Sequence, residues 1–224
     1  MKKETIGGAE YNTLTLKQVS GNVAKVDGVE FDSIEKAIKA CGTTESTIEI
    51  LRDSDPGATL VVEANQNITI DLKGYAINNY IEAQNAGTLK IKDTSTNQTG
   101  KIVGKLGMAI TNTGTLELQS GSIADSGIGM KNLESGVINV TGGKFTNNTY
   151  GLYNDSDKAT INITAGTIES NTYGVYSSKG TTNITSTGIN NNTYGVYIKG
   201  GTVNVKENAE VRSETGIYNQ SGTL

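Results

Sequence analysis

The hexapeptide Asn148-Thr149-Tyr150-Gly151-Leu152-Tyr153 decides the fold, because it returns further along the chain. It recurs as Asn171-Thr172-Tyr173-Gly174-Val175-Tyr176 and as Asn192-Thr193-Tyr194-Gly195-Val196-Tyr197, and a degraded copy follows at 214–218. The steps between successive repeat glycines are 22, 22, 23, 21 and 21 residues, along Gly107, Gly129, Gly151, Gly174, Gly195 and Gly216. Self-similarity at a fixed period of this length indicates a repeat protein.

Each repeat carries two further apolar segments. One supplies an alternating pair: Leu116/Leu118, Ile138/Val140, Ile161/Ile163, Thr182/Ile184 and Val203/Val205. The other supplies one apolar residue: Ile123, Phe145, Ile168, Ile189 and Val211. Alternation of apolar and polar residues indicates strands with one buried face and one solvated face.

Three short strands per repeat cannot bury their apolar faces alone, but stacked repeats can. The pattern therefore predicts a right-handed parallel β-helix of about eight turns, each turn pairing in parallel with the next about 4.8 Å away. A leucine-rich repeat has a similar period. It needs a leucine-dominated consensus and helical return segments, whereas this chain uses mostly Ile and Val, with return segments rich in Gly, Asn and Thr.

The pattern continues upstream with less regularity. Residues 88–91 match the second segment, and the step of 27 residues from Leu89 to Leu116 predicts an inserted loop around 94–100. Residues 67–72 and 47–51 have the composition of earlier strands.

One segment has helical spacing instead. It contains Ile34, Ala37, Ile38 and Cys41, and Asp32 with Glu35 matches a capping box. We expect this helix to cover the open end of the solenoid, because an exposed sheet edge templates aggregation.

These patterns divide the chain into three parts. Residues 1–21 are an N-terminal extension, either an added strand or the tail of a preceding domain. Residues 22–41 are a cap made of a strand pair and the helix, and residues 42–224 are the β-helix. The last segment, 216–224, parallels 107–116 and stops in mid-strand. We therefore expect a longer protein in which the solenoid, or a capping helix, continues.

Composition excludes several classes of function. A net charge of −4 and a pI near 5.0 provide no basic stretch for nucleic acid. With no His and one Cys, the chain can build neither a zinc site nor an intrachain disulfide. No apolar run approaches the roughly 20 residues of a membrane span. The basic start lacks the apolar stretch of a signal peptide, so we expect either an intracellular protein or a piece of an exported one.

Residues 26–38, 47–53 and 67–74 resemble the opening of pectate-lyase-like β-helix domains, in particular a group found in large surface proteins of Gram-positive, often gut-dwelling bacteria. The resemblance covers roughly residues 20–224. It implies an exported, wall-attached protein whose signal, anchor and further domains lie outside this chain. Enzymatic relatives cut acidic polysaccharides with calcium-binding Asp clusters and a basic Arg. This sequence has no match for that set, since its only arginines are Arg52 and Arg212.

A column of tyrosines is the first candidate site. Tyr153, Tyr176, Tyr197 and Tyr218 each lie two residues after a repeat glycine, opposite an inward apolar residue. Exposed aromatic rings suit a flat sugar, because they combine an apolar face with a polar tip. The alternative is architectural: identical side chains stack on successive turns and stabilise the solenoid.

Two asparagine columns accompany the tyrosines. Asn139, Asn162, Asn183 and Asn204, preceded by Glu117, lie between the inward pairs and either hydrogen-bond glycan hydroxyls or form a solvated face. Asn148, Asn171 and Asn192 lie at a strand corner, where amide ladders satisfy one another and the backbone.

Carboxylates for catalysis are the third candidate. Glycoside hydrolysis needs two, about 5–9 Å apart, and Asp125, Asp155 and Asp157 are the nearest candidates. Asp155 and Asp157 lie in a polar turn typical of solvent, with no apolar surroundings to raise a pKa. They also resemble half a calcium loop but lack its later bidentate Glu.

The sequence therefore favours a non-enzymatic, rigid segment of a bacterial surface protein, with no cofactor, that binds glycans or a host surface through a tyrosine and asparagine face. The alternatives are a polysaccharide-active glycosidase or lyase, and a spacer that binds nothing. We expect an extracellular location, no membrane insertion and covalent linkage to further domains.

Overall fold

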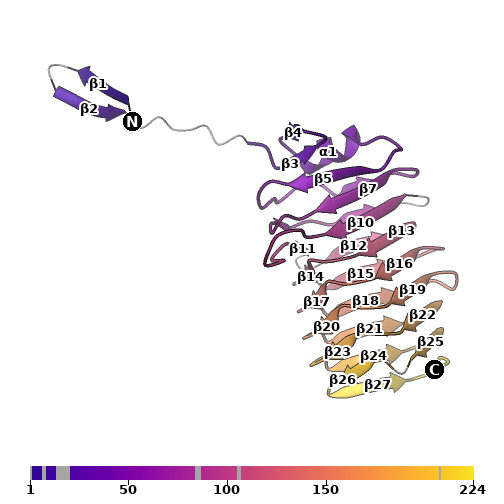
Figure 1. The fold of residues 1–224 in the computed structure, drawn as a ribbon. Helices are drawn as coiled ribbons and strands as arrows, with labels where there is room; N and C mark the ends of the chain where they lie inside the picture. Colours follow the sequence, from indigo (N-terminus) through magenta and orange to yellow (C-terminus); the bar gives the residue numbers. More distant parts are fainter. Residues whose placement is uncertain (1, 7–8, 14–20, 84–86, 105–106, 207) are drawn as a thin grey trace.

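The structure, a computed structural model, describes residues 2–6, 9–13, 21–83, 87–104, 107–206 and 208–224. From the cap onward the chain winds into a right-handed parallel β-solenoid of about eight turns of about 22 residues (Figure 1). The predicted fold is confirmed.

Three sheets form the walls of the solenoid, and each regular turn contributes one strand to each sheet. The ten-stranded sheet contains β4 (Val29–Phe31), β3 (Ala24–Val26), β5 (Ser46–Ile50), β7 (Asn67–Asp71), β10 (Thr88–Lys92), β13 (Thr115–Leu118), β16 (Val137–Val140), β19 (Thr160–Ile163), β22 (Thr181–Ile184) and β25 (Thr202–Val205). The seven-stranded sheet contains β8 (Ala76–Ile77), β11 (Lys101–Val103), β14 (Ser122–Ala124), β17 (Lys144–Thr146), β20 (Thr167–Glu169), β23 (Gly188–Asn190) and β26 (Glu210–Arg212). The eight-stranded sheet contains β6 (Leu60–Val62), β9 (Ile81–Ala83), β12 (Met108–Asn112), β15 (Ile128–Asn132), β18 (Tyr150–Asn154), β21 (Tyr173–Ser177), β24 (Tyr194–Ile198) and β27 (Thr215–Asn219).

The N-terminal extension contains β1 (Lys2–Ile6) and β2 (Ala9–Thr13), which pair antiparallel. Residues 1, 7–8 and 14–20 of the predicted extension lie outside the described residues.

The register of the solenoid follows the sequence repeat residue by residue. Leu116, Ile138, Ile161, Thr182 and Val203 pair in series across the ten-stranded sheet. The single apolar residues from Ile123 to Val211 pair in the same way across the seven-stranded sheet. Ile, Val and Leu side chains stack inside, around the fully buried Phe145. The return segments are strands, which excludes the leucine-rich-repeat alternative.

The N-terminal end carries a hairpin of β3 and β4 and the helix α1 (Ile34–Ala40). The helix packs against β3, β4 and the edge strand β6, so it covers the ends of two sheets (Figure 1). Among the described residues, no helix is long and apolar enough to cross a membrane.

The start of α1 differs from the predicted capping box. Ser33, not Asp32, is the N-cap: its backbone is extended and its Oγ accepts from the Lys36 amide at 3.2 Å. Asp32 instead forms an ion pair with the Lys36 ammonium at 2.8 Å. Glu35 lies in the first turn, where a carboxylate favours the helix dipole. The short Ser33 side chain reaches the third amide beyond it, which is the contact an N-cap requires.

The insertion predicted around 94–100 is present, between β10 and β11, and a buried carboxylate holds it. Asp93 is 3% exposed. Its two oxygens accept from the amides of Gly74 and Ser95 at 2.9 Å and from Gly100 at 2.6 Å. The insertion is therefore tied to the previous turn and does not disturb the pairing of Leu89 with Leu116.

The corner asparagines form the predicted ladder inside the solenoid. Asn148 Nδ2 donates to Asn171 Oδ1, and Asn171 Nδ2 donates to Asn192 Oδ1, both at 3.0 Å. The same column continues as serine at both ends: Ser126 Oγ accepts from the Gly104 amide, and Asn192 Nδ2 donates to Ser213 Oγ at 3.3 Å. Each amide thus satisfies backbone groups of the preceding turn and a side chain of the next turn.

Candidate functional site

Seven tyrosines gather on the outward side of four consecutive strands of the eight-stranded sheet, and we refer to them as the tyrosine surface. The predicted column is present, since Tyr153, Tyr176, Tyr197 and Tyr218 pair in register. A second column, which the sequence analysis missed, runs beside it: Tyr150, Tyr173 and Tyr194 also pair in register.

Both tyrosines of a repeat point outward because the glycine between them breaks the alternation of the strand. In β18 the order is partly exposed Tyr150, buried Gly151, buried Leu152 and partly exposed Tyr153. Two successive residues therefore face inward where a regular strand would have one. The sequence feature that indicates the second column is the repeated hexapeptide, in which both tyrosines recur together.

Most neighbouring rings within a column stack, but Tyr153 meets Tyr176 edge to face at 5.0 Å and 79°, and Tyr197 and Tyr218 are tilted by 31°. The centroids of Tyr150 and Tyr173 are 4.9 Å apart with an interplanar angle of 8°, and those of Tyr173 and Tyr194 are 5.2 Å apart at 9°. Tyr176 and Tyr197 stack at 5.1 Å and 11°. Rings that stack cover part of each other's faces, so their edges and hydroxyls are the parts left for a ligand.

Between the columns most rings meet edge to face, although Tyr150 and Tyr153 are stacked at 5.5 Å and 27°. Tyr173 and Tyr176 are 5.4 Å apart at 79°, and Tyr194 and Tyr197 are 5.4 Å apart at 86°. Both arrangements are favourable for aromatic pairs. This geometry supports the architectural alternative for the predicted tyrosine column, in which the rings stabilise the solenoid. A ligand could contact only ring edges, hydroxyls and the outermost rings.

The tyrosine surface ends in polar contacts. At one end the Lys131 ammonium lies 5.1 Å from the Tyr153 ring centroid and 2.9 Å from an oxygen of Asp155. Ser178 Oγ donates to the other Asp155 oxygen at 2.8 Å. At the other end Tyr197 donates to Gln220 Oε1 at 3.1 Å, and the final ring, Tyr218, is 43% exposed.

Burial changes the titration of this surface. Burial, together with four neighbouring phenols, raises the pKa of Tyr176 to about 12. Burial also acts to raise the pKa of Asp155, but hydrogen bonds from Lys131 and Ser178 outweigh it and the pKa is lowered. Asp155 is therefore held as a carboxylate.

The ionisation of Tyr176 is directly measurable. We expect the difference between the phenolate absorbance titrations of the parent and Tyr176→Phe to show a transition near pH 12, against about 10 for an ordinary tyrosine. Because the folded pKa is the higher one, the stability that Tyr176 contributes is fully present below about pH 10 and is lost as the pH rises toward 12. A difference titration centred near pH 10, with the fold intact by circular dichroism, would contradict this packing.

The predicted mid-strand asparagines lie on the ten-stranded sheet, so the structure does not bring them together with the tyrosines. They form a ladder of their own. Asn162 Nδ2 donates to Asn139 at 3.0 Å, Asn183 to Asn162 at 2.8 Å and Asn204 to Asn183 at 2.9 Å. The two candidate ligand sets therefore belong to separate faces.

The candidate catalytic carboxylates are dispersed. Asp125 pairs with Lys101 at 3.2 Å, Asp155 pairs with Lys131, and Asp157 is exposed in the turn before β19. Among the described residues, no group of three or more acidic or cysteine side chains could hold a metal ion. The described contacts of the two arginines are also separate, since Arg52 donates to the Gly21 carbonyl and Arg212 pairs with Glu210.

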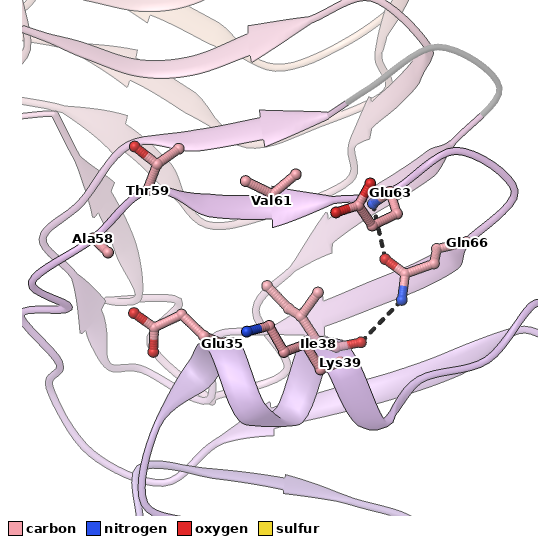
Figure 2. Close-up of a pocket in the computed structure, with 8 residues that line it drawn as sticks. All are labelled: Glu35, Ile38, Lys39, Ala58, Thr59, Val61, Glu63 and Gln66. Carbon is pink, nitrogen blue, oxygen red and sulfur yellow. Dashed lines mark hydrogen bonds between the residues drawn. The ribbon is translucent and has the colours of Figure 1, made fainter.

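A groove of about 400 Å³ lies between α1 and β6. Figure 2 shows Ile38 and Val61 on its opposite walls, with Glu35, Lys39 and Glu63 around them. Gln66 closes one side, where its amide donates to the carbonyls of Ile38 and Cys41 at 3.0 and 2.9 Å. This amide satisfies the C-terminal carbonyls of the helix, so its role here is structural.

Comparison with known protein families, with curated proteins and with solved structures found no match to this chain.

Proposed function

We propose that this chain is a non-enzymatic, rigid segment of a bacterial surface protein and that its tyrosine surface binds glycans. The observation that carries the proposal is the gathering of seven partly exposed tyrosines on β18, β21, β24 and β27. Tyrosine is well suited to recognition because it offers a large amphipathic contact area with few torsions to immobilise. The resemblance of residues 20–224 to β-helix domains of Gram-positive surface proteins supports the proposed location.

The ring geometry favours one mode of contact. Ring edges and hydroxyls repeat about every 4.8 Å along the solenoid axis, so a linear polysaccharide lying along the axis meets an equivalent tyrosine at each turn. Stacking already fixes the rings, which lowers the entropy lost on binding. Weak contacts repeated along one chain add up, so affinity should rise with the length of the oligosaccharide.

An enzymatic role has less support from the same geometry. A general acid for glycoside hydrolysis needs a raised pKa, whereas Asp155, the carboxylate beside the tyrosine surface, has a lowered one. Release of reducing sugars from a polysaccharide panel by the purified domain would overturn the non-enzymatic proposal.

The test is affinity electrophoresis against soluble neutral and acidic polysaccharides. Tyr176→Ala should weaken binding about five- to tenfold, as expected for the loss of one aromatic contact. Tyr176→Phe keeps the stack and removes only the hydroxyl, so it separates hydrogen bonding from ring contact. Thr167→Ala, an outward substitution on β20 of the seven-stranded sheet, is the matched control.

Two outcomes would contradict the proposal. Binding that survives Tyr176→Ala and Tyr197→Ala would place the ligand on another face. Absence of binding to every polysaccharide in the panel would favour the spacer alternative, in which the tyrosines serve only to stack.

A further inference from the structure

A second face of the molecule is nearly uncharged and regular. It lies on the outward side of β16, β19, β22 and β25, and we refer to it as the threonine–asparagine array. Its four rows are Val137, Asn139 and Thr141; Thr160, Asn162 and Thr164; Thr181, Asn183 and Thr185; and Thr202, Asn204 and Lys206. All are partly or fully exposed, and Lys206 is the one charge in these rows.

The asparagines and two of the threonines of the array are held in place before any ligand arrives. The asparagine amides are tied into one ladder by hydrogen bonds of 2.8 to 3.0 Å. Thr141 and Thr164 donate to backbone carbonyls of the preceding turn at 3.3 and 3.2 Å. A surface whose side chains are already ordered loses little conformational entropy on binding.

The ladder leaves spare hydrogen-bonding capacity. An asparagine amide has two N–H donors and an oxygen with two lone pairs. Within the ladder, Asn162 and Asn183 each use one donor toward one neighbour and accept one bond from the other. Each of these two turns therefore has one amide donor and one acceptor left, beside the hydroxyls of Thr160 and Thr181, which can do both, and the Thr164 hydroxyl, which can accept.

We infer that the threonine–asparagine array binds the flat face of an insoluble, neutral polysaccharide. Hydroxyl groups of a ligand fit sites that both donate and accept hydrogen bonds. Anions fit sites with donors alone, and cations fit sites with acceptors alone. The rows repeat about every 4.8 Å and the side chains along a strand about every 6.6 Å. A regular, rigid array matches a partner that is itself flat and regular. The inference extends the glycan-binding part of the proposed function to a second face and does not depend on the tyrosine surface.

Co-sedimentation with microcrystalline cellulose and with crystalline chitin tests this directly. The parent domain should sediment with at least one of the two solids. Thr160→Lys places a charge at the first outward position of β19 and should weaken retention about tenfold, because an unpaired charge would be desolvated in the contact. Thr167→Lys makes the same change at the first position of β20 in the same turn and should be retained like the parent.

The variants also separate this inference from the tyrosine proposal. Tyr176→Ala should sediment normally although it binds soluble polysaccharide weakly. Loss of sedimentation in Tyr176→Ala, with Thr160→Lys unaffected, would assign the solid to the tyrosine surface and overturn the inference while leaving the proposed function standing. Failure to sediment with either solid, incorporation into ice instead, or dimerisation that Thr160→Lys abolishes would also overturn it.

Discussion

Replacing Gly174 with alanine is expected to lower the free energy of unfolding by about 2–3 kcal/mol, the usual cost of overpacking a rigid interior. A Cβ at this position would lie 2.7 Å from the carbonyl oxygen of Gly195 on the next turn. The same contact recurs at Gly129, Gly151 and Gly195, each against the backbone oxygen of the following glycine at 2.5 to 2.6 Å. The obstacle is a backbone carbonyl oxygen, so it cannot move aside as the far end of a flexible side chain would.

Denaturant unfolding, followed by tyrosine fluorescence and circular dichroism, checks this expectation. Gly42→Ala is the control, because a Cβ there meets nothing within 4 Å. It should leave stability unchanged or raise it slightly through the entropy of the unfolded chain. Equal stability of the two variants would show that the turns can separate at the repeat glycine without penalty.

The regular spacing of the repeat glycines also explains why the pairing register of the strands could be predicted from the sequence. Parallel in-register stacking places like residues above like residues, so spacing along the chain becomes position in the sheet. The alignment of Tyr153 with Tyr176 and of Leu116 with Ile138 follows from that rule alone. The insertion at 94–100 was predictable for the same reason, since the pattern resumes after it.

Two features did not follow from the period. Strict alternation puts Tyr150 and Tyr153 on opposite faces of a strand, and only the paired inward residues at the glycine bring both outward. The same shift buries Asn154, which with Asn112 and Asn132 forms a second interior asparagine column. The repeat spacing aligns these three asparagines, but asparagine is mostly a surface residue. The sequence therefore provided no reason to predict that they are buried.

The orientation of the tyrosine rings could also not be predicted from the sequence. A column of aromatic residues at one-turn spacing is compatible with rings turned outward as platforms and with rings stacked along the axis. Side-chain torsions decide between them, and those depend on the second column packed beside the first. Tyr176 meets Tyr173 edge to face and stacks on Tyr197. The part of the tyrosines expected to contact a ligand therefore changes from ring faces to ring edges and hydroxyls.

Asn171→Leu is expected to have the largest effect on stability, about 4 kcal/mol. Asn171 Oδ1 accepts from both the amide and the side chain of Asn148, at 2.9 and 3.0 Å. Its Nδ2 donates to the carbonyls of Phe145 and Glu169 and to Asn192 Oδ1. The side chain is 3% exposed, so leucine would leave several polar groups without partners, at about 1–3 kcal/mol each.

The chain itself supplies a milder substitution for this site. Serine occupies the same column at positions 126 and 213, where its hydroxyl accepts backbone amides from the preceding turn. Asn171→Ser should therefore keep an acceptor for the Asn148 amide and lose roughly half as much stability as Asn171→Leu, measured by the same denaturant unfolding. Asn183→Leu, in the exposed ladder, should cost less than about 1 kcal/mol because water replaces the lost bonds. If Asn171→Leu lowered the free energy of unfolding no more than Asn183→Leu does, the corner ladder would not stabilise the fold. The corners of the solenoid would then be stabilised by strand pairing and the repeat glycines alone.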